Sequence, residues 1–135
     1  MPKNKPKKPA APDQGQVAIR WADDVVEHDY AAAHAYLSIK LSASAADKAV
    51  DRLRKAELTS RRANDILRAA GLTPAPLDDP GVVKDVIKVI EGKVLSPVLV
   101  VNGVNGADIA DGFHRVSLVY RIDPYGVVPL RLAEA

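Results

Sequence analysis

The chain contains no cysteine, so disulfides, thiolate nucleophiles and cysteine metal ligands are excluded. Aromatic residues make up only 4% of its 135 residues, which predicts an aliphatic core. No apolar run approaches the length of a membrane span. The apolar and charged fractions, 47% and 27%, are those of a globular domain. We therefore expect a cytoplasmic protein with a single domain and no membrane partner.

Positive charge is concentrated at the start of the chain. Four lysines lie in its first twelve, proline-rich residues: Lys3, Lys5, Lys7 and Lys8. No acid precedes Asp13, and the remainder is close to neutral. This composition predicts a disordered tail over residues 1–15, followed by one domain over 16–135. Contact of the tail with nucleic acid or an acidic surface is the alternative; a signal peptide would need an apolar segment there.

Helical spacing of apolar residues predicts a mainly helical N-terminal half. A short strand or lead-in is expected at 17–21, and helices in parts of 22–37, at 44–56 and at 60–70. Ser44 and Asp47 are spaced almost as a capping box, and Gly71 is typical of a helix C-terminus.

The C-terminal half alternates between helix and strand. A helix is predicted from Asp79 to Gly92, called here the third helix because only 44–56 and 60–70 are counted before it, and a fourth helix after residue 115. Strands are predicted at 97–101, at about 107–110 and, as the last strand, at 127–132. Pro129 argues against a central position for that strand. We expect an α+β fold in which a small mixed β-sheet carries the third and fourth helices, with a helical N-terminal extension.

The most informative segment is residues 111–115, Asp-Gly-Phe-His-Arg, between an apolar strand and a helix. Gly112 allows close approach of the backbone to a ligand. The helix start offers unpaired N–H groups and the positive end of its dipole, and His114 and Arg115 add donors. The pattern predicts a phosphate site. In the alternative, Asp111 only caps the helix and Arg115 pairs with a surface acid.

Three motifs resemble the partition-protein-B and sulfiredoxin (ParB/sulfiredoxin-like) superfamily, in the same order. They are residues 92–100 (GKVLSPVLV), 109–115 (IADGFHR) and 128–131 (VPLR). The resemblance covers about residues 82–132. It implies a glycine turn that holds nucleotide phosphates, or a DNA-associated module. Carried over, Gly112, His114 and Arg115 are phosphate contacts.

The chain differs from known branches of this superfamily in two ways, and each difference excludes one function. Sulfiredoxin needs a cysteine where Phe113 stands, so reduction of a sulfinic acid is excluded. Partition proteins carry an acid and two arginines after the glycine and a downstream DNA-binding domain. This chain has Phe113-His114-Arg115 and stops soon after its last strand, so we do not expect a full partition protein.

The first functional hypothesis is a nucleotide- or phosphate-binding protein, including the options of a phosphotransferase or nucleotide hydrolase. ATP or another nucleotide with Mg²⁺ is the expected cofactor. Asp111 and His114 are the candidate catalytic residues, Asp111 as base or Mg²⁺ ligand. The candidate phosphate contacts are Gly112, His114, Arg115, Lys84 and Ser96. Arg115→Ala is expected to weaken phosphate binding with little loss of stability.

Some of the candidate phosphate contacts can also be explained without a ligand. Lys84 is at least as well explained as a solvated lysine, and Ser96 as a strand-edge residue. A catalytic protein needs a second acid near the turn, for which Asp85 and Glu91 are candidates. The second hypothesis is a non-catalytic DNA-associated or protein-interaction module. Oligomeric state is left open.

A weak nucleic-acid signal lies in the N-terminal half. Arg61, Arg62 and Arg68, with Arg54 nearby, are expected to form a basic cluster across two helices. A solvated charged face is the alternative, and Asp65 lies between Arg61 and Arg68. DNA is a possible partner, but the scarcity of aromatics argues against single strands. His28 and His34 are six residues apart, not four, so no metal site is predicted.

The tail gives the first testable prediction. Residues 1–12 lack apolar side chains to offset the entropy of ordering. Deleting them is expected to leave the melting temperature within about a degree or two in calorimetry. A drop well beyond that would show that the tail docks on the domain.

Overall fold

The structure, a computed structural model, describes residues 18–103 and 106–135. The described part is α+β, with five helices and a mixed four-stranded sheet. The predicted tail lies outside the described residues, as do residues 104–105 between the strands predicted at 97–101 and about 107–110. The elements in chain order are β1 (Arg20–Trp21), α1 (Glu27–Lys40), α2 (Ala43–Lys55), β2 (Leu58–Arg62), α3 (Ala63–Ala70), α4 (Pro80–Ile90), β3 (Val94–Leu95), β4 (Val98–Gly103), β5 (Gly106–Asp111), α5 (Phe113–Ile122) and β6 (Val127–Glu134).

The main sheet has the strand order β2-β6-β4-β5. Strands β4 and β6 are parallel, and the other two pairs are antiparallel. The expectation that Pro129 keeps β6 from the sheet interior is wrong. Pairing of β6 with β4 begins one residue later, at Leu130 opposite Val98. At Pro129 itself β6 is therefore paired only with β2, opposite Ser60, as an edge strand would be.

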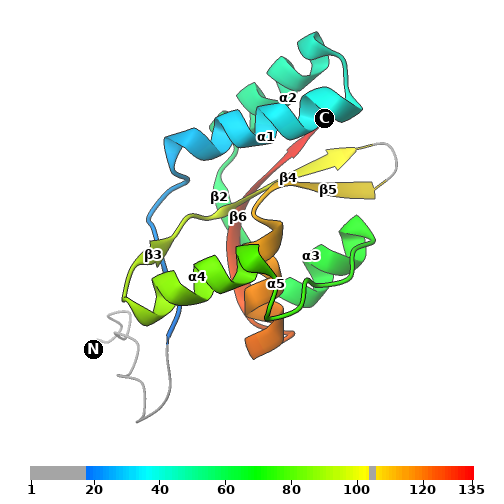
Figure 1. The fold of residues 1–135 in the computed structure, drawn as a ribbon. Helices are drawn as coiled ribbons and strands as arrows, with labels where there is room; N and C mark the ends of the chain where they lie inside the picture. The colour runs from blue at the N-terminus through cyan, green and yellow to red at the C-terminus, as the bar shows by residue number, and fades with distance from the viewer. Residues whose placement is uncertain (1–17, 104–105) are drawn as a thin grey trace, which may run out of the picture.

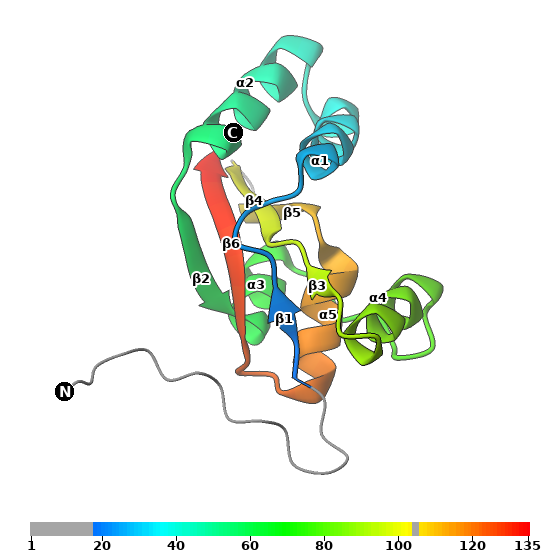
Figure 2. The same ribbon diagram turned by 90° about the vertical axis from the view of Figure 1, so that its left-hand side faces the viewer.

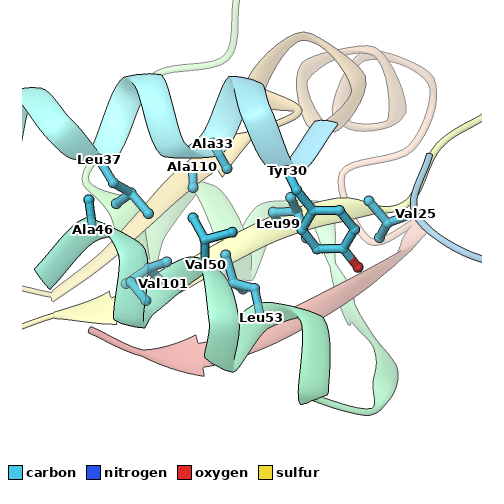
Figure 3. Packing of buried hydrophobic residues seen from close by; sticks show 11 residues of the cluster. Val25, Tyr30, Ala33, Leu37, Ala46, Val50, Leu53, Leu99, Val101 and Ala110 are labelled. Atoms are coloured by element: carbon cyan, nitrogen blue, oxygen red, sulfur yellow. The ribbon is translucent and has the colours of Figure 1, made fainter. Parts of the chain in front are cut away.

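Helices cover both faces of this sheet (Figure 1). Leu99 and Val101 of β4 face α1 and α2, while Val98 and Val100 face α3 and α5. Figure 3 shows the first of these clusters, with Leu53 of α2 inside it. Because β4 is buried on both faces, its sequence reads as one continuous apolar run without alternation.

Helix α4 lies outside these layers, against α5 (Figure 2). Its buried Val82 and Val89 pack with Leu95 and Leu118. The expectation that both the third and fourth helices pack on the sheet is thus correct for α5 only. A second sheet has two strands, β1 and β3, which are parallel. Trp21 of β1 and Leu95 of β3 pack in the same cluster as α4.

Two expectations about the N-terminal half are corrected. Residues predicted to open the helix at 60–70 form β2, because they pair with β6 more than sixty residues away. Only Ala63–Ala70 is helical, and Gly71 ends it with a φ of 67° as predicted. The cap of α2 is Ser42 rather than Ser44, since the Ser42 hydroxyl accepts from the Ala45 N–H at 3.1 Å.

The core predicts a clear contrast between two aliphatic truncations. Leu53 is fully buried, whereas Ile39 of α1 is 85% exposed. Leu53→Ala is expected to lower the free energy of unfolding by about 2–5 kcal/mol, and Ile39→Ala by less than about 0.5 kcal/mol. Urea denaturation of both variants measures this; equal losses would contradict the packing.

Candidate functional site

The predicted phosphate turn joins β5 to α5. Gly112 has φ 112° and ψ 15°, in the left-handed region. A Cβ there would lie 2.7 Å from Cγ2 of Val98, so only glycine fits without displacing the buried Val98 side chain. No side chain caps the N-terminus of α5. Asp111 is therefore not a helix cap, and the first N–H groups of α5 have no capping side chain.

Arg115 holds a buried ion network instead. Its Nη1 donates to the Ser96 carbonyl at 2.6 Å and to Asp29 at 3.1 Å, and its Nη2 donates to Asp111 at 2.6 Å. The Arg115 side chain is only 12% exposed. These bonds join α5 to α1, to the end of β5 and to the segment between β3 and β4. Arg115 thus pairs with the buried Asp29 and the partly buried Asp111, not with an exposed acid.

A cavity of about 390 Å³ surrounds this network. It brings together all the residues that the sequence predicted for phosphate binding and catalysis: Lys84, Ser96, Asp111, Gly112, His114 and Arg115. Its lining also includes His28, Asp29, Asp85 and Lys88. Of the two proposed second acids, Asp85 lines the cavity. Glu91 is absent from the lining and pairs with Lys93 at 3.1 Å.

Two basic groups reach the cavity from α4, where Lys84 and Lys88 are one turn apart. From α5, His114 Nε2 lies 3.2 Å from the Asp79 carboxylate that caps α4. A Cβ at Gly81 would lie 2.6 Å from the His114 ring, so this glycine allows the two helices to approach. The cavity therefore combines two lysines with a histidine held at its edge.

Ser96 has a structural partner. Its hydroxyl accepts a hydrogen bond from the Val26 N–H at 3.0 Å, just before α1. The same residue offers its carbonyl to Arg115. Ser96 therefore fixes the cavity wall, which is closer to the strand-edge alternative than to a ligand contact.

The cavity also contains carboxylates whose ionised forms are disfavoured. Burial raises the pKa of Asp111, against the effect of Arg115 and together with that of Asp29. Burial likewise raises the pKa of Asp85, against the effects of Arg115 and Lys88. A carboxyl whose pKa is higher in the folded state costs stability at pH values above that pKa, and the cost disappears as pH falls.

Asp29 is the site residue that sequence reasoning missed. It lies in the first turn of α1 and is 6% exposed. Nothing in the local pattern separates it from the surface acids around it, because its partner Arg115 is 86 residues away. Only the tertiary packing of α1 against β4 and β5 brings the two together.

The basic residues of the N-terminal half do not form the expected helical cluster. Arg61 and Arg62 lie on β2, while Arg68 lies on α3. Asp65 pairs with Arg62 at 2.9 Å and with Arg68 at 3.6 Å. Arg61 borders a second, mainly apolar hollow of about 270 Å³. Its other lining residues are Asp65, Ile66, Ala69, Val100, Asn102, Ala107, Leu130 and Leu132.

The described residues contain neither a metal-binding cluster nor a helix suited to cross a membrane. Within 18–103 and 106–135, no group of three or more histidines and acids is arranged to hold a metal ion. No helix in this part of the chain has the length and apolar character needed to cross a membrane.

The chain was also compared with known proteins. No family model matches it, and no curated protein or solved structure matches it. The geometry of the cavity is therefore the basis for assigning a function.

The ion network overturns the expectation that Arg115→Ala leaves stability unchanged. Without the guanidinium of Arg115, the carboxylates of the buried Asp29 and the partly buried Asp111 would lack their cation. We expect the free energy of unfolding to fall by about 3–5 kcal/mol in urea denaturation. The control is Arg68→Ala, which removes an exposed pair at a cost below about 1 kcal/mol. A loss for Arg115→Ala no larger than the control's would contradict the network.

Proposed function

We propose that the chain is a phosphate-binding protein of the ParB/sulfiredoxin-like superfamily, whose cavity receives the phosphate of a nucleotide or another small molecule. One observation carries the proposal. The two lysines of α4, His114 and the uncapped start of α5 converge on one cavity of about 390 Å³. That volume lies within the usual range for small-molecule pockets. The order of helix, hairpin, glycine turn, helix and strand supports the superfamily assignment.

In this proposal the donors come from backbone and lysine. The N–H groups at the start of α5 and its dipole attract the anion, and Gly112 leaves room for its approach. Lys84 and Lys88 neutralise phosphate charge from α4. Arg115 has a different role from the one the sequence suggested. With two carboxylates and a carbonyl as partners, it positions the turn instead of neutralising the ligand.

The carboxylates limit the role of Mg²⁺. Arg115 already binds Asp29 and Asp111, so neither presents an unoccupied carboxylate for a metal. Mg²⁺ commonly binds through one or two carboxylates together with substrate phosphates. A nucleotide would therefore bring Mg²⁺ on its own phosphates, with Asp85 as the nearest carboxylate without a protein partner among the described residues.

Binding is supported better than turnover or a DNA-associated role. Asp111, the predicted base, accepts a hydrogen bond from Arg115 at Oδ2 at 2.6 Å, so this oxygen is already occupied. Phosphoryl transfer or nucleotide hydrolysis would need another base. The alternative of a DNA module receives less support, because Arg62 and Arg68 are both paired with Asp65.

The lysines provide the test of this function. Lys84→Ala and Lys88→Ala are each expected to weaken phosphate binding about ten-fold, because each removes a charge-assisted contact. Isothermal titration with inorganic phosphate, pyrophosphate and ATP, with and without Mg²⁺, measures the change. The matched control is Lys48→Ala on the exposed surface of α2.

Two outcomes would contradict the proposal. One is absence of binding by the parent protein to every one of these ligands at millimolar concentration. The other is an equal loss of affinity in the Lys48→Ala control and the two cavity variants, which would indicate nonspecific attraction.

A further inference from the structure

Asp85 is the cavity residue that phosphate binding alone does not explain. It lies on α4 and is only 8% exposed. It has no hydrogen bond or ion pair with any residue in the described part of the chain. Among the described residues, no side-chain oxygen that is completely buried lacks a hydrogen-bond partner, so the unpaired Asp85 oxygens retain accessible surface, and Asp85 lines the cavity.

The other two cavity carboxylates differ in this respect. Asp29 and Asp111 both bind Arg115 directly. Lys84, Lys88, His114 and Arg115 act on Asp85 only through their charge. Burying a carboxylate without a partner costs stability, and a negative charge beside a phosphate weakens anion binding. Both costs fall if the ligand itself supplies a cation for Asp85.

We propose that the ligand is a phosphate ester that carries a primary ammonium group, and that Asp85 binds this ammonium. The inference rests on the proposed function, since the phosphate is held by the same cavity. An ammonium provides charge and hydrogen-bond donors together, which a hydroxyl group does not.

The position of Asp85 on α4 sets the spacing of the two ligand groups. Lys88 is three residues beyond Asp85, and side chains so spaced lie on neighbouring positions of a helix, about 5–6 Å apart at Cβ. Phosphate and ammonium sites on one helical turn suit a ligand whose charged groups are separated by a short carbon chain. A compound such as 2-aminoethyl phosphate has this form.

A pair of ligands isolates the ammonium. Ethyl phosphate and 2-aminoethyl phosphate share the phosphate ester and differ in the amine. The parent protein is expected to bind the amino ester at least about ten-fold more tightly in isothermal titration. Asp85→Asn keeps the side-chain shape and removes the charge. It is expected to abolish this preference by weakening the amino ester while leaving ethyl phosphate bound as tightly or more tightly.

Asp23→Asn, at an exposed position outside the cavity, is the matched control and should keep the preference of the parent. Circular dichroism verifies that both variants fold. Because burial raises the pKa of Asp85, Asp85→Asn should be at least as stable as the parent at neutral pH.

The outcomes separate this inference from the function on which it rests. If both esters bind and Asp85→Asn leaves their affinity ratio unchanged, the ammonium proposal is wrong and phosphate binding stands. If ethyl phosphate binds only with Mg²⁺ and Asp85→Asn abolishes that requirement, Asp85 serves a metal ion and the proposal is again overturned. If neither these esters nor inorganic phosphate and ATP bind, the proposed function fails as well.

Discussion

The guanidinium of Arg115 is the interaction on which the cavity depends. It connects Asp29 in α1, Asp111 at the end of β5 and the Ser96 carbonyl before β4, all from the first turn of α5. Three regions that are distant in sequence, namely α1, the segment before β4 and the turn from β5 to α5, are thereby fixed around one point. Because planar guanidinium groups bind carboxylates with defined directions, the network also sets the orientation of the Gly112 turn.

This arrangement separates the positioning of the site from the binding of its ligand. Removing one partner of a buried ion network leaves an uncompensated charge, so the network is hard to alter without loss of the fold. The lysines on α4 and His114 at the uncapped start of α5 line the cavity and take no part in this network. They can change partners when a ligand arrives, while Arg115 and its acids stay in place. Asp85 is the exception, as a buried acid without such a partner among the described residues.

Sequence reasoning was most successful where the signal was local. The strand, glycine and helix at 111–115 could be recognised because residue types and turn chemistry coincide within a few positions, and the caps Gly71 and Asp79 follow the same logic. It failed where partners are remote. Residues 60–62 were predicted to open a helix but belong to β2, which pairs with β6, and Asp29 becomes a site residue only through Arg115. Arg61 was grouped with Arg68 because seven residues separate them, a spacing that places two side chains on one face of a helix. That rule does not apply to Arg61, because it lies on strand β2. The superfamily assignment remains a proposal that the order of elements supports.

The central claim is that the cavity between α4 and α5 is the phosphate site. Amide chemical-shift mapping of the ¹⁵N-labelled protein during titration with pyrophosphate tests it most directly, because each backbone N–H reports its own position. The largest shifts are predicted at Phe113, His114 and Arg115, with a second group around Lys84 and Lys88. Largest shifts at Arg61, Arg62 and Arg68, with the start of α5 unchanged, would contradict the account and place anion binding on the basic residues of β2 and α3.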